Sequence, residues 1–198
     1  MSGFALLVGL VALTRLVELG ISARHRRKLV EQGARPIAET GFRAMVLLHV
    51  GILAGSIVEP LLAPRSVPLP LALAAVFGVV LANLLRIAAI RALGEHWNVR
   101  VVDSTALGVV HSGPYRYVRH PNYVAVFLEL LLLPLVQGAW VTATVGALLH
   151  ALVLRRRILL EESVLFLNPK YALCMGKRPR FVPRFFSNAR KVARWARE

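Results

Sequence analysis

The stretch GPYRYVRHPNY, Gly113–Tyr123, lies between two strongly apolar parts of the chain and marks where the membrane part meets a polar part. Its eleven residues include two prolines, three tyrosines, two arginines and one histidine. A short connection between two hydrophobic helices needs only to be polar. We therefore interpret this dense mixture of aromatic and basic side chains as one wall of a binding site at the membrane surface.

The composition of the chain indicates an integral membrane protein. Hydrophobic residues make up 57% of the 198 residues, and the mean hydropathy is +0.60. A soluble domain of this size has too small an interior for so much apolar surface. The net charge is nevertheless +15, so the basic residues must lie in the connections, as they do in membrane proteins with basic cytoplasmic loops. Because no basic stripe lies on a soluble fold, we expect no nucleic-acid partner.

Five apolar segments predict an all-α integral membrane bundle of five transmembrane helices. A helix needs roughly 20 residues to cross about 30 Å of hydrocarbon. The segments that reach this length are Gly3–Ser22, Ala44–Ala63 and Leu69–Leu93. Two further segments of about 15 residues each would give only about 23 Å of helix, and we expect them to form a short helical hairpin. These are Asn122–Val136 and Ala139–Leu154.

The distribution of Lys and Arg predicts the orientation of the bundle. Six basic residues lie in the first connection and many lie in the tail, whereas the second connection holds only Arg65 and the fourth holds none. We therefore expect the N-terminus outside and the C-terminal helix in the cytoplasm. The third connection then shares the cytoplasmic side with the tail, so residues after Arg155 can complete a site that begins at Gly113–Tyr123.

The chain is expected to form a single domain, 1–198. Three N-terminal spans occupy 1–93, and the part that we expect to hold the binding site occupies 94–198. The single cysteine, Cys174, excludes an internal disulfide and offers no metal cluster, and we predict no metal site. The sequence leaves the oligomeric state open.

The motifs of the second half resemble the isoprenylcysteine carboxyl methyltransferase family and its phospholipid methyltransferase relatives. The residues that carry the resemblance follow in the family's order: Gly113-Pro114-Tyr115-Arg116, Arg119-His120-Pro121-Asn122-Tyr123, Glu161-Glu162, Tyr171 and Pro179-Arg180. The resemblance covers 94–183, and it implies that the segment 94–198 is the catalytic core that binds the cofactor. The chain departs from the family at Met175, where a second aromatic residue is common. The first half is similar to a bacterial branch that acts beside type III polyketide synthases on alkylpyrones or phenolic lipids, which implies a bacterial inner membrane.

The resemblance implies an enzyme that uses S-adenosylmethionine and releases S-adenosylhomocysteine. The methyl group would go to an oxygen, a carboxylate or a hydroxyl, of a lipid-like acceptor in the bilayer. Prenylcysteine, alkylpyrone, phenolic lipid and phospholipid all stay open as acceptors. Two alternatives also stay open: an NADPH-dependent membrane reductase of the sterol-reductase type, which resembles this fold, and a non-catalytic lipid-binding protein.

The cofactor is expected to lie against the cytoplasmic start of the fourth span. Pro121 suits the first position of a helix, so Arg119 and His120 would lie at its N-terminus, where free N–H groups favour a carboxylate. Tyrosine rings would contact the adenine, and a glutamate would accept hydrogen bonds from the amine and ribose. The predicted cofactor-binding residues are Val110, Gly113, Tyr115, Arg119, His120, Tyr123, Glu161 and Glu162. The resemblance favours Glu162 over Glu161, and Glu161 could instead pair with Arg157 on one helix face.

Glu129 and Arg180 are the predicted catalytic residues. A carboxylate inside an apolar run is costly and is by default a functional candidate. Glu129 could deprotonate a hydroxyl acceptor or simply pair with Arg86, and Arg180 could position an acidic acceptor or bind anionic headgroups. The predicted substrate-binding residues are Trp97, Arg86 and Tyr171, with Trp97 equally suited to an interfacial anchor. We expect the other polar residues of the spans to make interhelical contacts: His49, Asn83 and His150 by hydrogen bonds, and Arg15 and Glu18 as an ion pair.

Overall fold

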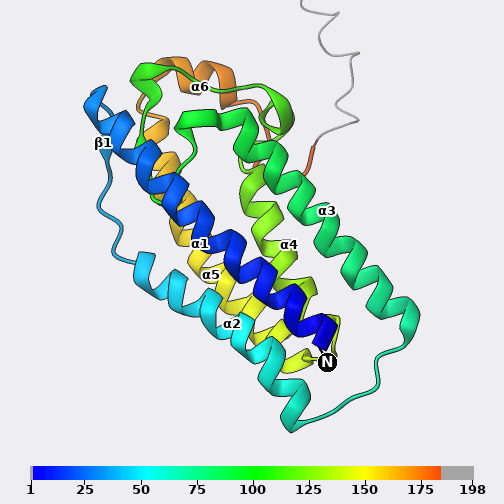
Figure 1. Cartoon of the computed structure of the whole chain (residues 1–198). Coiled ribbons are helices and arrows are strands. Elements are labelled where there is room, and N and C mark those ends of the chain that lie inside the picture. The colour runs from blue at the N-terminus through cyan, green and yellow to red at the C-terminus, as the bar shows by residue number, and fades with distance from the viewer. Residues whose placement is uncertain (1, 184–198) are drawn as a thin grey trace, which may run out of the picture.

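The computed structural model describes residues 2–183 and is mostly helical (Figure 1). The helices are α1 (Ser2–Glu31), α2 (Phe42–Leu62), α3 (Leu69–Leu93), α4 (Pro121–Leu135), α5 (Trp140–Leu165) and α6 (Pro169–Met175). Three short 3-10 turns lie in the long third connection: η1 (Gly94–His96), η2 (Thr105–Leu107) and η3 (Gly113–Arg116). The end of the predicted basic tail lies outside the described residues.

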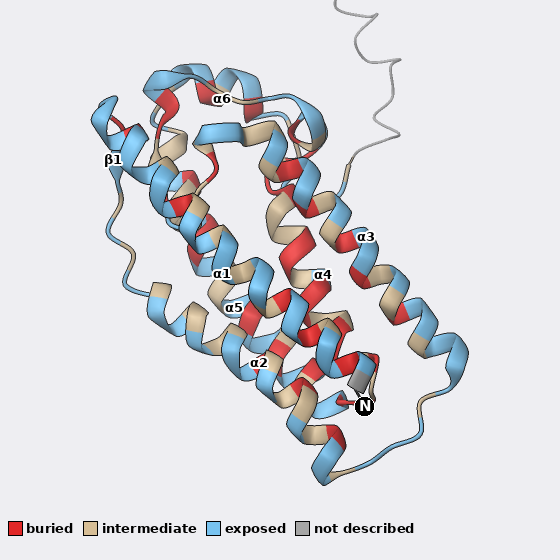
Figure 2. Ribbon diagram, viewed as in Figure 1, coloured by how far each residue is buried: buried red, intermediate tan, exposed pale blue. Residues whose placement is uncertain are grey.

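Three of these helices, α1, α2 and α3, are long and apolar enough to cross a membrane. Their outward faces carry large hydrophobic side chains such as Leu6, Leu47 and Leu84, which are more than half exposed in the isolated chain. Figure 2 shows these exposed outer faces, while buried positions concentrate on α4. The chain is therefore an integral membrane protein. The predicted count of five spans is not confirmed, because α4 is a shorter apolar helix of 15 residues.

The helix boundaries follow the predicted spans closely in the middle of the chain and depart from them at α1 and α5. The bounds of α3 are the predicted Leu69–Leu93. Helix α1 continues to Glu31 instead of ending at Ser22, and α5 continues to Leu165 instead of Leu154. In both cases the apolar run is followed by a stretch that contains Arg, Leu and Glu, which are strong helix formers, and no Gly or Pro.

Helix α4 occupies the centre of the bundle and packs against α2, α3 and α5. Its buried positions recur at helical spacing and include Ala125, Leu130 and Leu133. Helix α3 comes close because Gly78 leaves room for the side chain of Leu132. Helix α1 joins through an apolar cluster that contains Phe4, Val8, Val11, Ala75, Val79, Leu133 and Val136.

A two-stranded ribbon ties the first connection to the third. Strand β1 (Arg35–Pro36) pairs antiparallel with β2 (Val102–Asp103). Arg100 lies over the ring of Phe42, 4.3 Å from its centroid. Strands of two residues have no alternating pattern, so the sequence did not indicate them. Figure 1 shows β1, α6 and the start of α4 at one end of the bundle and the N-terminus at the other.

Candidate functional site

The GPYR turn places its aromatic ring by a tight approach to α3. Gly113 has a φ of +55°, and a Cβ there would lie 2.9 Å from the Cβ of Ala92. Gly113 and Pro114 begin η3, and Tyr115 is buried in a cluster with Ala89, Tyr171 and Met175. Gly113 therefore acts through the backbone, and Met175, the expected departure from the family pattern, is packed in the same cluster as Tyr115.

Glu162 joins the end of α5 to the start of α4 and to the chain after α6. Its carboxylate lies 3.0 Å from Nε2 of His120, 2.6 Å from Nη2 of Arg180 and 3.2 Å from Nη2 of Arg119. Burial alone would raise the pKa of Glu162, but the hydrogen bonds from His120 and Arg180 and the charge of Arg119 outweigh it and lower the pKa to about 2. Glu162 is thus a carboxylate that holds three segments together.

The main chain closes the same junction. The N–H of Arg119 donates to the carbonyl of Pro179 at 2.9 Å, and the N–H of His120 donates to the carbonyl of Arg180 at 3.0 Å. These two N–H groups, expected to hold a carboxylate of the cofactor, therefore have partners in the chain itself. The sequence could not reveal this pairing, because the segments lie some 60 residues apart.

Tyr123 connects Glu161 to Arg157. The hydroxyl of Tyr123 donates to the carboxylate of Glu161 and accepts a hydrogen bond from Nε of Arg157 at 2.9 Å. Arg157 also forms an ion pair with Glu39 at 2.6 Å and donates to the carbonyl of Val99. The predicted direct contact between Arg157 and Glu161 is replaced by this chain of contacts, since the tyrosine hydroxyl lies between the two side chains.

A cavity of about 120 Å³, here called the cofactor cavity, is bordered by Tyr123, Arg157 and Glu161. The predicted site residues that line it are Trp97, Val110, Tyr115, Arg119, His120, Tyr123, Glu161 and Tyr171. Gly113 and Glu162 do not line it, so Glu161 is the member of the acidic pair that faces the cavity. Trp97 is only 2% exposed, so it is not an anchor at the membrane interface.

The lining of the cofactor cavity suits a molecule with a carboxylate, an amine and an adenine. Arg119 supplies a buried Nε that has no hydrogen-bond partner among residues 2–183, and Glu161 supplies a carboxylate. Tyr115, Leu165 and Met175 supply apolar surface. Sequence reasoning missed the amides that also line the cavity, Asn98 and Asn122, whose buried Oδ1 atoms have no partner in the described part of the chain. Asn122 stands inside the HPNY motif, which could have pointed to it.

A second cavity, here called the apolar groove, lies between α4 and α5 and has a volume of about 580 Å³. Phe127, Leu128, Leu154 and Ile158 are among the apolar residues that line it. The apolar groove is also lined by four polar or aromatic residues: Tyr123, Arg155, Arg180 and Phe181. Arg180 thus lies on the groove, but its guanidinium is bound by Glu162.

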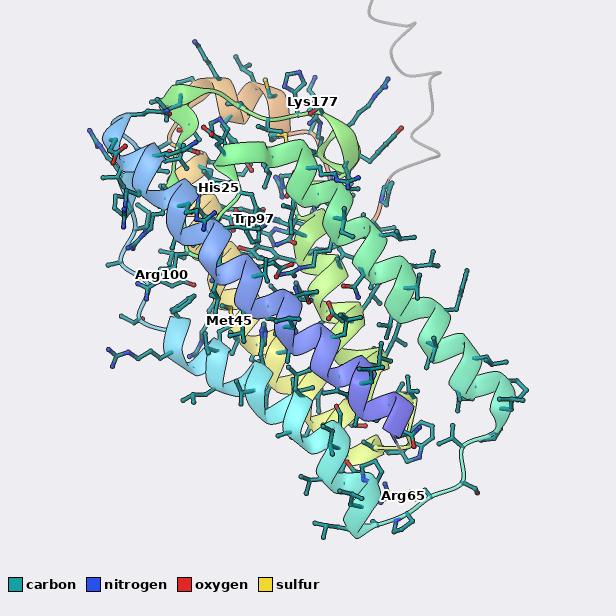
Figure 3. The ribbon with its side chains drawn as sticks, viewed as in Figure 1. His25, Met45, Arg65, Trp97, Arg100 and Lys177 are labelled. Carbon is teal, nitrogen blue, oxygen red and sulfur yellow. The ribbon has the colours of Figure 1, made fainter. Side chains whose placement is uncertain are left out.

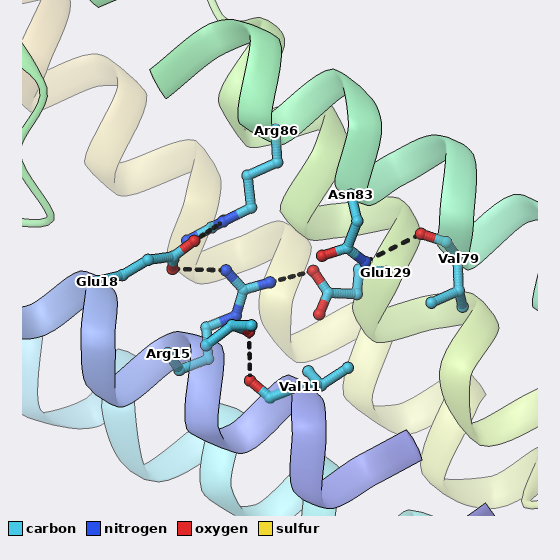
Figure 4. Close-up of polar contacts among 8 residues, drawn as sticks. Val11, Arg15, Glu18, Val79, Asn83, Arg86 and Glu129 are labelled. Carbon is cyan, nitrogen blue, oxygen red and sulfur yellow. Dashed lines mark hydrogen bonds and ion pairs between the residues drawn. The ribbon is translucent and has the colours of Figure 1, made fainter. Parts of the chain in front are cut away.

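Glu129 lies in a cluster of four charges between α1, α3 and α4 (Figure 4). Its side chain is fully buried and is bound by Arg15, while Arg86 binds Glu18. The predicted pair of Arg15 and Glu18 is confirmed at 2.7 Å. The expected contact of Arg86 with Glu129 is not the one formed, because α1 contributes two charges of its own, Arg15 to Glu129 and Glu18 to Arg86. Glu129 lines none of the three cavities found in the described residues.

Sequence similarity relates the chain to one described family and to two uncharacterized bacterial proteins. A model of the "Isoprenylcysteine carboxyl methyltransferase (ICMT) family" matches residues 73–167. The chain is 29% identical over 162 residues to the uncharacterized protein YpbQ of Bacillus subtilis, with 82% of this chain and 96% of that protein covered. It is 30% identical over 156 residues to an uncharacterized protein of Haemophilus influenzae, with 76% and 88% covered. The matched region holds α4, the GPYR turn and both glutamates, and the chain belongs to the isoprenylcysteine carboxyl methyltransferase family.

Proposed function

We propose that this membrane protein transfers a methyl group from S-adenosylmethionine to an oxygen of a lipid-like acceptor. The family supports a membrane methyltransferase. The main support for this donor and this acceptor is that the cofactor cavity and the apolar groove meet at one side chain, Tyr123, which lines both. A water-soluble donor and a bilayer-soluble acceptor need such a meeting point.

Each part of the cofactor cavity has a role in this proposal. When bound, the cofactor supplies a methyl group on a sulfonium, whose neutral sulfide leaves without help from an acid. Arg119 binds the carboxylate of the cofactor by a charge-assisted hydrogen bond. Glu161 accepts hydrogen bonds from its amine or ribose, and the apolar surface of Tyr115, Leu165 and Met175 contacts the adenine.

The apolar groove holds the acceptor's chain so that its oxygen reaches the methyl carbon. Phe127, Leu154 and Ile158 bury hydrocarbon, and holding two reactants in line lowers the barrier by removing the entropy of encounter. The junction at Glu162 supports both walls, because it fixes the start of α4 against the end of α5. Arg180 lies where it can meet an acidic headgroup, with Glu162 balancing its charge.

We also propose the orientation that the basic residues favour. The N-terminus lies outside and the site with the C-terminal part lies in the cytoplasm, in a bacterial inner membrane. The cofactor then enters from the cytoplasm, and prenylcysteine, alkylpyrones, phenolic lipids or phospholipids enter from the bilayer through the apolar groove.

Binding measurements separate this proposal from its alternatives. The protein in lipid nanodiscs is heated with S-adenosylhomocysteine or with NADPH, beside the variant His120→Ala. S-adenosylhomocysteine should raise the melting temperature of the wild type and not of the variant, because His120 holds Glu162 and lines the cavity. Stabilisation by NADPH alone would indicate a reductase, and no effect of either compound would favour a non-catalytic lipid-binding protein. Mass spectrometry of membrane lipids that gain a labelled methyl group then identifies the acceptor.

A further inference from the structure

A third cavity, here called the polar chamber, adjoins the cofactor cavity and has a volume of about 60 Å³. The residues that line both spaces form one partition, here called the shared wall: Trp97, Asn98, Asn122, Tyr123 and Arg157. Figure 3 labels Trp97 in the half of the molecule that also holds Lys177, away from Arg65. A molecule in the cofactor cavity therefore meets the side chains of the shared wall.

Three buried polar atoms of the shared wall have no hydrogen-bond partner in the described part of the chain. They are Oδ1 of Asn98, Oδ1 of Asn122 and Nε1 of Trp97. Trp97 is only 2% exposed, so its N–H is not hydrated by bulk water. Because a buried polar group without a partner is costly, native structures rarely keep several in one place. Two unpaired acceptors and one unpaired donor therefore indicate a site for a polar group from outside the chain.

The chain holds this part of the shared wall in place without a ligand. The N–H of Val99 donates to Oγ of Ser22 at 2.8 Å, and the carbonyl of Val99 accepts a hydrogen bond from Arg157. Nδ2 of Asn98 donates to the carbonyl of His96, so Oδ1 is the amide atom that is left for a ligand. Such preorganisation reduces the entropy lost on binding, and it makes the acceptor pattern a property of the fold.

The unpaired atoms of the shared wall select among the parts of the cofactor. A carboxylate only accepts hydrogen bonds, so it cannot satisfy the two amide oxygens, and an ammonium only donates, so it cannot satisfy the indole N–H. The ribose hydroxyls have a stronger acceptor in the carboxylate of Glu161, which lines the cofactor cavity but not the polar chamber. The edge of adenine carries an amine that donates and a ring nitrogen that accepts, so it satisfies both kinds of atom.

The apolar lining agrees with this placement of the base. Tyr115, Leu165 and Met175 line the cofactor cavity and not the polar chamber, so they lie apart from the shared wall. An adenine whose faces contact these apolar side chains can direct its polar edge to the amides. Face and edge are then recognised by different residues.

We propose that Asn98 and Asn122 accept hydrogen bonds from the exocyclic amine of adenine and that the indole N–H of Trp97 donates to a ring nitrogen beside it. The inference rests on the proposed function and deepens it, because it names the residues that set the base specificity of the methyl donor. Hypoxanthine carries an oxygen where adenine carries the amine. This oxygen would face the two amide oxygens with no hydrogen between them, so the site accepts an adenosyl donor and rejects an inosyl one.

The test compares two ligands that differ only in the base, S-adenosylhomocysteine and S-inosylhomocysteine. Their dissociation constants are measured by calorimetry with the protein in nanodiscs. The wild type should bind the adenosyl compound at least about 30-fold more tightly, because the inosyl compound leaves two buried amide oxygens unpaired. This readout needs neither turnover nor a variant.

Variants then assign the selectivity to the shared wall. Asn98→Leu and Asn122→Leu remove the amide oxygens at nearly constant volume, and each should lower the selectivity for the adenosyl compound to less than about 10-fold. The loss should come from weaker binding of the adenosyl compound, with the affinity for the inosyl compound changed by less than about 3-fold. A purely structural role would weaken both ligands alike and leave the ratio unchanged.

Asn83→Leu is the matched control. The amide of Asn83 donates to the carbonyl of Val79 within α3, and Asn83 lines none of the three described cavities, so both affinities should stay within about 2-fold of the wild type. Trp97→Phe keeps an aromatic ring without the N–H and should weaken S-adenosylhomocysteine binding by about 5–10-fold.

The possible failures are distinguishable. Equal affinity of the wild type for the two ligands, or a selectivity that stays the same in both asparagine variants, would overturn the inference and leave the assignment of the cofactor intact. Unchanged affinity in Trp97→Phe would overturn the role of the indole. If the wild type binds neither ligand, the proposed function itself is refuted.

Discussion

Removing Glu129 should destabilise the protein, and removing Arg15 with it should restore most of the loss. Glu129 is fully buried and its contact is Arg15, so Glu129→Leu leaves two guanidinium groups, those of Arg15 and Arg86, competing for Glu18. Breaking a buried pair from one side costs about 3–5 kcal/mol. For a chain of this size each kcal/mol lowers the melting temperature by about 2–4 °C, so we expect a drop of about 6–20 °C.

In the double variant Arg15→Met, Glu129→Leu, the remaining charges Arg86 and Glu18 neutralise each other. Its melting temperature should therefore lie closer to that of the wild type than to that of Glu129→Leu. Thermal unfolding in nanodiscs measures all of these, with Glu95→Gln as the control because the Lys28–Glu95 pair is exposed and should matter little. Losses that simply add would refute the view of a coupled charge cluster. A stable double variant that transfers no methyl group would give Glu129 the catalytic role predicted from the sequence.

Three further predictions concern the cofactor end. Because the folded-state pKa of Glu162 is about 2, below its ordinary 4.5, its contribution to stability is complete above about pH 5 and should disappear as the pH falls towards 2. Between about pH 5 and pH 2, the melting temperature of Glu162→Gln should therefore fall less steeply than that of the wild type. Tyr123→Phe removes the hydroxyl that Arg157 contacts and should weaken S-adenosylhomocysteine binding about 10-fold by calorimetry, as loss of a charge-assisted hydrogen bond does. Unchanged affinity would exclude Tyr123 from the site. Gly113→Ala forces a left-handed backbone and a clash with Ala92, and it should lower the melting temperature by about 2–8 °C.

The spans and the motif cluster could be predicted from the sequence because they depend on local patterns. Leu69–Leu93 is bounded by Pro68 and Gly94, which stop the helix on both sides. The meeting of His120 with the acidic pair was predicted from the order of connections and is confirmed by the contact of His120 with Glu162. The preference for Glu162 over Glu161 is not supported, because Glu161 lines the cofactor cavity and Glu162 does not. Which of two adjacent residues faces a cavity depends on how α5 is rotated about its axis, and the contacts that set this rotation come from distant segments.

The remaining features depend on how distant segments cross. Arg15 lies far from Glu129 in the chain, and only the packing of the helices in the bundle brings them together. His49 and His150 each read as a single polar residue in an apolar span, and the close approach of α2 to α5 makes them a pair. The contact of Arg157 with Glu39 could not be predicted either, because Glu39 lies in a connection between helices whose sequence has no periodic pattern.

Photolabelling tests most directly whether the start of α4 and the end of α5 enclose the methyl donor. An azido-adenine analogue of S-adenosylhomocysteine is bound to the protein in nanodiscs, irradiated, and the labelled peptides are mapped by mass spectrometry. The label should fall within 93–123 or 161–175 and should disappear when excess S-adenosylhomocysteine competes. Competable label confined to α1 or α2, or no competable label at all, would contradict the account.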